Sequence, residues 1–119
     1  MNDDLRVHRE AEGFMGRADQ ARAQNRPLDA ARFDCQAAAL EAQVFDLLPL
    51  DRPKTRSITA VSSVASYRKA GALDEAIRHA EYFLTQQAVA DFSRLDLEEM
   101  IEEMRAELDA TAAIERLLS

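Results

Sequence analysis

Apolar residues recur every three or four positions in five successive stretches of this chain, and that spacing constrains its fold most strongly. The period matches the 3.6 residues of a helical turn and places the apolar side chains of each stretch on one side of a helix. Only three glycines and three prolines interrupt the 119 residues, whereas Ala, Leu, Glu, Arg and Gln, all strong helix formers, are plentiful. The sequence therefore predicts an all-α fold of antiparallel helical hairpins within one domain.

Short breaks divide the five expected helices into a first hairpin over residues 3–48, a second over 52–89 and a C-terminal capping helix over 93–118. Each helix is expected to turn one apolar stripe toward the core. The stripe residues are Val7, Ala11, Phe14, Ala18 and Ala21; Leu28, Ala31, Cys35, Ala38, Ala42 and Phe45; Ala60, Val61, Val64 and Tyr67; Leu73, Ala76, Ile77, Ala80 and Leu84; and Leu97, Met100, Ile101, Met104 and Leu108.

The residues at the breaks predict where the helices begin and end. Pro27 suits the first turn of the second helix, where its missing N–H is tolerated. Asp51 is the expected N-cap of the third helix, and either Ser93 or Asp96 is the expected cap of the last. Gly71 is a natural stop for the third helix.

Charge and cysteine content limit the classes of partner and compartment. Residues 1–50, 51–90 and 91–119 carry net charges of −3, +2 and −6, so most of the surface repels nucleic-acid phosphates. One cysteine, Cys35, precludes an internal disulfide and suggests a reducing compartment. No signal peptide or membrane-spanning run is evident, so we expect a cytoplasmic protein that binds neither membrane nor nucleic acid.

An internal repeat links the two hairpins. Leu-Asp-x-Ala occurs at residues 28–31 and again at 73–76, an offset of 45 residues, and periodic helix pairs are the mark of helical solenoids. Around the second copy, residues 57–84 contain Tyr67, Gly71, the acidic pair Asp74-Glu75 and then Ala76. In these positions the segment resembles a tetratricopeptide repeat (TPR). The first hairpin matches less well, because Arg22 stands where the second has Tyr67.

Three features depart from that family's pattern. The offset between the two copies is 45 residues, whereas the family's usual period is about 34 residues. No tryptophan marks the repeat start. Ala80 stands where the family usually has an aromatic residue, and Phe83 stands where it usually has alanine. The resemblance implies a short TPR-like solenoid that binds a partner protein or peptide along the inner face formed by the first helix of each pair. The residues assigned to that face are Gly13, Gly16, Gln20, Ile58, Val61, Ala65, Arg68 and Lys69. The two glycines predict either close helix packing or close approach of a partner.

Three cations, Arg52, Lys54 and Arg56, fall within five positions at the start of the third helix. Positive charge there opposes the helix macrodipole, at a cost of a few tenths to about 1 kcal/mol. A chain selected only for stability would place acids at these positions, so the cluster is a candidate site for a carboxylate or phosphate. The alternatives are a solvated helix start and ion pairing with the acidic last helix.

Catalytic and cofactor signatures are absent from the sequence. His8 and His79 lack metal-ligand spacing, and no glycine-rich phosphate loop or nucleophile elbow occurs. Cys35 is expected to be a structural thiol on a core-facing stripe. The glutamates between residues 98 and 107 are spread over the polar faces of one helix, as expected for a solvated surface. We therefore expect no cofactor, no metal and no enzymatic activity.

Three hypotheses about function follow. The first is a small adaptor that binds another protein through the inner face and the basic connection at 52–56. The second is a regulatory or neutralising subunit of the immunity or antitoxin type, whose acidic C-terminal helix covers a basic site on an enzyme. The third is an enzyme or RNA-binding domain. The last helix ends with three apolar residues, Ile114, Leu117 and Leu118. Homodimerisation, packing on the domain and partner binding are three alternative roles for them.

Overall fold

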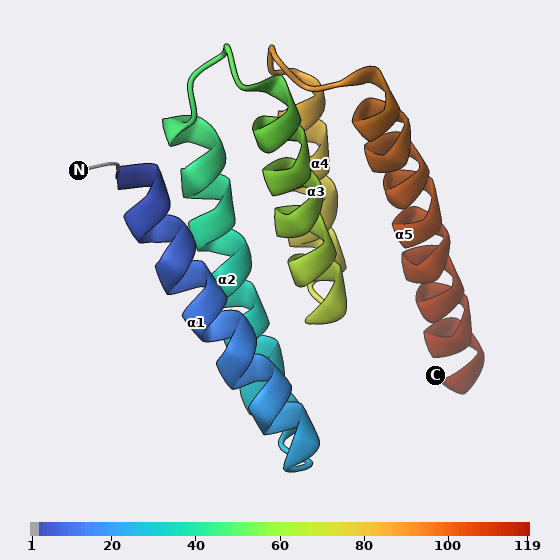
Figure 1. Cartoon of the computed structure of the whole chain (residues 1–119). Helices are drawn as coiled ribbons and strands as arrows, with labels where there is room; N and C mark the ends of the chain where they lie inside the picture. The colour runs from blue at the N-terminus through green and yellow to red at the C-terminus, as the bar shows by residue number, and fades with distance from the viewer. Residues whose placement is uncertain (1–2) are drawn as a thin grey trace.

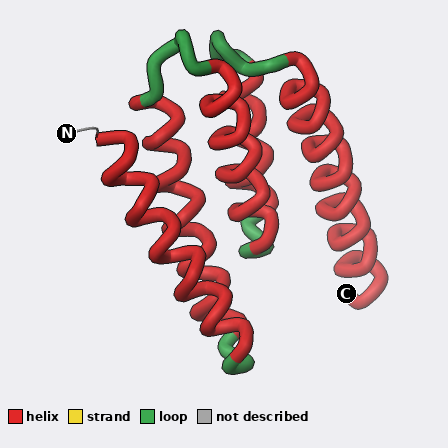
Figure 2. Tube along the Cα trace, viewed as in Figure 1, coloured by secondary structure: helices red, strands yellow, loops and turns green. Residues whose placement is uncertain are grey.

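The computed structural model describes residues 3–119 and contains five α-helices, with no strand in that range (Figures 1 and 2). The helices are α1 (Asp3–Ala23), α2 (Pro27–Leu47), α3 (Pro53–Lys69), α4 (Leu73–Leu84) and α5 (Asp91–Leu118). The predicted all-α hairpin architecture is confirmed. Within residues 3–119, no helix combines the length and apolar character needed to cross a bilayer.

The helices pack mainly on their neighbours in the chain: α1 on α2, α2 on α3, α3 on α4 and α4 on α5, with a further contact between α3 and α5. In Figure 1, α1 and α3 lie in front of α2 and α4, while α5 lies to one side and continues past the lower ends of α3 and α4. Helix α2 lies behind and between α1 and α3 in this view.

Both hairpins are closed by the same turn. Asn25 and Gly71 have positive φ angles of 57° and 79°. The N–H of the next residue donates to the carbonyl five positions back, Arg26 to Ala21 at 2.8 Å and Ala72 to Tyr67 at 3.0 Å. These are Schellman-type helix ends, which favour glycine or asparagine at the left-handed position.

The turns place the structural repeat at an offset of 46 residues, one more than the sequence alignment. Ala21 is then equivalent to Tyr67, and Ala30 rather than Ala31 is equivalent to Ala76. This one-residue shift rotates the start of α2, and Leu28, expected in the core, is 85% exposed. The predicted position of Leu28 is therefore wrong.

The core lies among α2, α3, α4 and α5, where Phe45 and Phe83 are completely buried with their ring centroids 4.7 Å apart. Most stripe positions predicted for these helices are buried or packed against this cluster. Helix α1 contributes mainly small residues, because its buried positions are Val7, Ala11, Ala18 and Ala21.

Two predictions about helix starts are wrong, and so is the close-packing alternative for the two glycines of α1. The N-caps of α3 and α5 are Arg52 and Ala90, and neither helix has a side-chain cap hydrogen bond. Ser93 lies buried inside α5 rather than capping it. Gly13 and Gly16 are exposed, and a Cβ added to either would meet no atom within 4 Å, so neither serves close packing.

Candidate functional site

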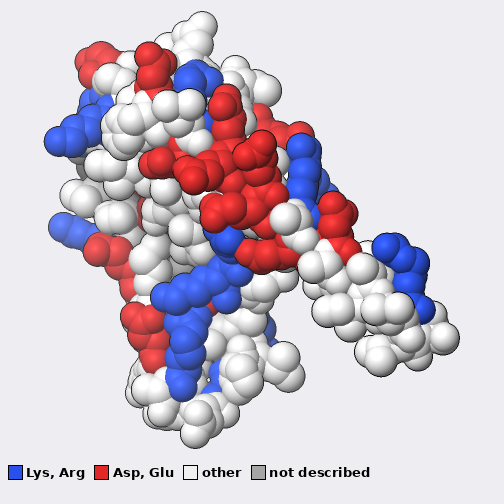
Figure 3. All heavy atoms as spheres, turned by 90° about the vertical axis from the view of Figure 1, so that its right-hand side faces the viewer, with Lys and Arg blue, Asp and Glu red and all other residues white. Residues whose placement is uncertain are grey.

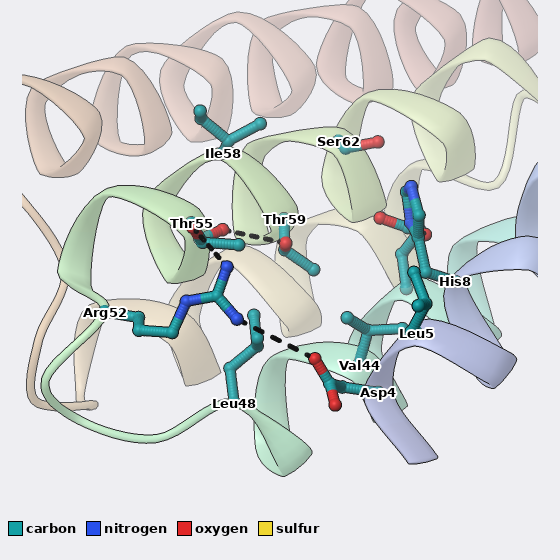
Figure 4. A pocket seen from close by; sticks show the side chains of 11 residues that line it. Asp4, Leu5, His8, Val44, Leu48, Arg52, Thr55, Ile58, Thr59 and Ser62 are labelled. Atoms are coloured by element: carbon teal, nitrogen blue, oxygen red, sulfur yellow. Dashed lines mark hydrogen bonds and ion pairs between the residues drawn. The ribbon is translucent and has the colours of Figure 1, made fainter. Parts of the chain in front are cut away.

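A groove runs between α1 and α3 with α2 as its floor; we call it the α1–α3 groove. Its first half encloses about 480 Å³ and is shown in Figure 4. The side chains around it combine apolar walls with a few polar groups, an arrangement typical of binding sites. They are Asp4, Leu5 and His8 from α1, Glu41, Val44 and Leu48 from α2 and its end, and Arg52, Thr55, Ile58, Thr59 and Ser62 from α3 and its N-cap.

The second half continues along the same two helices and encloses about 260 Å³. Its lining is Met15 and Asp19 from α1, Asp34 from α2, and Ser62, Ala65, Ser66 and Lys69 from α3. Ser62 lines both hollows, so they are neighbours along α3. At about 1.5 Å per helical residue, the distance from Thr55 to Lys69 gives a groove roughly 20 Å long.

Glu41 is an acidic side chain at the floor of the first half. Its residue is only 2% exposed, and His8 Nδ1 lies 2.8 Å from its Oε1. Burial raises the pKa of the Glu41 carboxyl, and the hydrogen bond to His8 partly offsets that increase. The His8 ring is itself half-buried at the wall of the groove, where its Nε2 lies 3.6 Å from Glu12.

Asp34 occupies the corresponding place in the second half and is 3% exposed. Its Oδ2 accepts a hydrogen bond from the guanidinium of Arg22 on α1. Burial raises the pKa of this carboxyl, while Arg22 and Lys69 act in the opposite direction. Lys69 also approaches Asp19 across the groove, with Nζ 3.7 Å from Oδ1.

Arg52 is the cation of the 52–56 cluster that reaches the groove. Its guanidinium lies 3.9 Å from the Asp4 carboxylate and donates to Thr55 Oγ1 at 3.4 Å, as Figure 4 shows. About half of this side chain is exposed, so these weak contacts can be exchanged for others. Ile58 lies one turn after Thr55 on α3, at the rim of the groove, and is 57% exposed.

Arg56 does not belong to an exposed basic surface. It is 4% exposed, and its guanidinium donates to the carbonyls of Phe45, Leu48 and Gln87 at 2.9, 2.9 and 3.2 Å. It also stacks 4.0 Å above the Phe45 ring. The charge that opposes the α3 macrodipole therefore caps the C-terminus of α2, which explains its position without a ligand.

Arg94 plays the equivalent capping role at the connection between α4 and α5. Each arginine is the fourth residue of its helix. The Arg94 guanidinium donates to carbonyls of Leu84, Gln86 and Val89 at the end of α4 and the loop that follows. Ser57, next to Arg56, accepts a hydrogen bond from the Ala90 N–H at 2.7 Å and joins the two connections.

The other residues assigned to the inner face are divided between the groove and other surfaces. Ala65 and Lys69 line its second half. Arg68 faces α5, where it forms ion pairs with Glu103 and Glu107 at 3.6 and 2.6 Å. Lys54 and Gln20 are exposed outside the lining of the groove. The basic 52–56 cluster thus contributes one cation, Arg52, to the candidate site.

A second surface lies on α5. Figure 3 shows Asp and Glu side chains gathered over this side of the molecule. The shallow hollow here is lined by Leu95, Glu98, Glu99, Ile101, Glu102 and Arg105. Past Leu108 the helix continues for a further ten residues, and there Ile114, Leu117 and Leu118 are exposed.

The nucleophilic and metal-binding capacity of the described residues is small. Cys35 is half-buried, and burial together with the Asp34 carboxylate raises the pKa of its thiol. A thiol kept protonated in this way is a poor nucleophile. Across residues 3–119 no group of three or more His, Cys, Asp or Glu side chains is placed to hold a metal ion.

Sequence reasoning missed the acidic floor of the groove. Asp34 and Glu41 stand seven residues apart on the same side of α2 as the buried residues Ala37 and Ala38. Two acids on a buried helix face were the signal available in the sequence. The α1 wall was also misplaced, since it is formed by residues such as His8 and Met15 rather than by Gly13 and Gly16.

Comparisons of the chain with protein-family models, with curated proteins and with solved structures find no match.

Proposed function

We propose that this protein is a small non-catalytic interaction module that binds a segment of a partner protein in the α1–α3 groove. The observation that carries the proposal is the groove itself, an open channel with apolar walls and a few buried polar groups on its floor. Leu5 and Ile58, which are 45% and 57% exposed, supply most of the apolar surface that a ligand can cover in the first half, while the buried side chains of Val44 and Leu48 lie beneath it. Burying such surface on binding is favourable by roughly 25 cal/mol per Å².

The shape of the groove favours a peptide over a compact ligand. Its two halves follow one line for about 20 Å, the length of six or seven residues of extended chain at roughly 3.1–3.3 Å per residue. The resemblance of residues 57–84 to a tetratricopeptide repeat supports the same assignment, because the groove lies between the first helices of the two hairpins. The basic connection contributes through Arg52, at the end of the channel.

A second candidate function rests on the acidic side of α5. Exposed carboxylates surround Leu95, which is itself 65% exposed, so this side of the molecule offers apolar and acidic groups together. A regulatory or neutralising subunit of the immunity or antitoxin type would cover a basic enzyme site with this surface. The two candidates predict different binding surfaces on one molecule.

Selection from a library of random twelve-residue displayed peptides tests both proposals, with three forms of the protein as bait. These are wild type, Ile58→Arg at the rim of the groove, and Leu95→Arg on α5 as the matched control. The replaced side chains are exposed, so both variants should retain the fold. We expect the enriched peptides to bind wild type and Leu95→Arg but to lose binding to Ile58→Arg.

Peptides lost with Leu95→Arg and kept with Ile58→Arg would move the site to α5 and favour the second candidate. A library that yields no peptide sensitive to either substitution would refute both assignments.

A further inference from the structure

The spacing of the two buried carboxylates on α2 specifies the chemistry of a partner. Asp34 and Glu41 are seven residues apart, so they lie about 10.5 Å apart along the helix axis and within about 20° of the same direction. Both line the floor of the α1–α3 groove, one in each half. The floor therefore carries two acidic points at a fixed separation along the channel.

Each carboxylate has a partner on α1 that engages one of its oxygens. His8 uses Oε1 of Glu41, and Arg22 uses Oδ2 of Asp34. Within the described residues, Arg56 Nε is the side-chain polar atom that is both fully buried and without a hydrogen-bond partner. Glu41 and Asp34 both line the groove, although they are only 2% and 3% exposed. The described residues place no hydrogen-bond donor on the second oxygen of either carboxylate, and that oxygen is the acceptor available to a ligand in the groove.

We infer that the α1–α3 groove recognises an extended basic segment with two Lys or Arg residues three positions apart. One cation reaches Glu41 and the other reaches Asp34. Aliphatic side chains next to the first cation lie against the exposed apolar side chains of Leu5 and Ile58. The inference rests on the proposed function and specifies the chemical class of the partner.

The three-residue spacing follows from geometry. A polyproline II segment rises about 3.1 Å per residue with three residues per turn, so positions i and i+3 point the same way about 9.3 Å apart. That separation is close to the 10.5 Å between the acids. In a flat β-strand, positions separated by three residues point to opposite sides, and positions separated by two lie only about 6.5–7 Å apart.

The charges around the groove also favour a basic ligand. The Coulomb attraction between a cation and a carboxylate is stronger at a buried acid than at an exposed one, because less water screens it. Arg52 and Lys69, one in each half, are close to Asp4 and Asp19 at 3.9 and 3.7 Å. Their charges are partly neutralised within the protein, which reduces their repulsion of a basic ligand.

The test is fluorescence anisotropy with labelled eight-residue peptides of identical composition, built from proline, leucine, alanine and two lysines. One peptide has lysines at positions 3 and 6, and the comparison peptide has them at positions 3 and 4. We expect the 3,6 peptide to bind about tenfold or more tightly than the 3,4 peptide. Equal affinities, or no binding of the 3,6 peptide up to about 1 mM, would overturn the inference.

Isosteric variants locate the contacts. Glu41→Gln and Asp34→Asn remove one charge each and keep side-chain shape, whereas Glu98→Gln removes an exposed charge on α5 and is the matched control. We expect each groove variant to weaken the 3,6 peptide about tenfold and the control to leave it unchanged. Thermal unfolding of each variant verifies that the fold is retained.

Ile58→Arg separates this inference from the proposed function. Suppose that library-selected peptides lose binding to Ile58→Arg but bind Glu41→Gln and Asp34→Asn as well as wild type. The groove then remains the binding site, and the basic-segment inference is wrong. If the selected peptides bind all three variants like wild type, the proposed groove function is wrong as well.

Discussion

Replacement of Arg56 should destabilise the protein far more than replacement of Arg52, four residues earlier. Arg56→Ala leaves the buried Leu48 carbonyl without its guanidinium donor, and the Phe45 carbonyl keeps only a 3.3 Å hydrogen bond from the Leu48 N–H. A buried polar group left without a partner costs about 1–3 kcal/mol. Loss of the guanidinium from the Phe45 ring removes a further ~1–2 kcal/mol.

One effect opposes these losses. The Arg56 Nε is buried without a hydrogen-bond partner, and alanine removes that desolvated donor. Allowing for this, we expect Arg56→Ala to reduce the free energy of unfolding by about 3 kcal/mol. For a urea m-value of about 2 kcal/mol per M, the midpoint would fall by roughly 1.5 M.

Urea unfolding followed by far-ultraviolet circular dichroism measures this change. Arg52→Ala is the matched control, since its contacts are exposed, and it should change the free energy of unfolding by less than about 0.5 kcal/mol. Arg56→Lys should lie between the two, because an ammonium keeps the charge but cannot span three carbonyls. If Arg56→Ala and Arg52→Ala have the same midpoint, the capping role of Arg56 is refuted.

Three further predictions concern groups that are partly buried. Arg94→Ala should destabilise the protein by about 2–3 kcal/mol in the same urea assay, because three carbonyls after α4 lose a donor, and an effect below 0.5 kcal/mol would contradict this role. Burial, and then Arg78, lower the pKa of His79, whose Nδ1 lies 2.9 Å from the Glu75 carbonyl. The neutral ring therefore contributes stability above pH ~6.5 that is lost as the pH falls through the depressed pKa. Wild type should lose more stability between pH 7 and 5 than His79→Gln, and parallel pH profiles would exclude this contribution. The Cys35 thiol, with its raised pKa, should react with a disulfide reagent at least ~100-fold faster in urea-unfolded than in native protein, whereas similar rates would show that it is accessible.

Much of the fold could be predicted because the apolar stripes of α3, α4 and α5 bury the residues that their period indicates. Val64, Ile77 and Met104, one from each of these helices, are all in the core, as expected. The error at Leu28 arose because the Leu-Asp-x-Ala repeat suggested an offset of 45, whereas the Schellman turns fix it at 46. Local turn geometry determined the register, and the turn at Asn25 was not apparent from composition.

The candidate site was harder to predict because it depends on contacts between distant residues. The local argument about charge at a helix start identified Arg56 as unusual, but it could not show that the side chain turns inward to the end of α2. Glu41 and Asp34 were missed because an acid on a buried helix face gains significance only from partners on α1. Arg52 and Ile58, in contrast, were assigned to binding and do line the groove.

The central claim is that the α1–α3 groove is the binding surface. The most direct test is to record amide chemical shifts of the isotope-labelled protein while adding a peptide selected on it. If the groove is the binding surface, the largest chemical-shift changes fall at residues 4–8 of α1 and 55–66 of α3, and the shifts of residues 95–105 of α5 stay unchanged. Shifts concentrated at residues 95–105, with α1 and α3 unperturbed, would contradict the account.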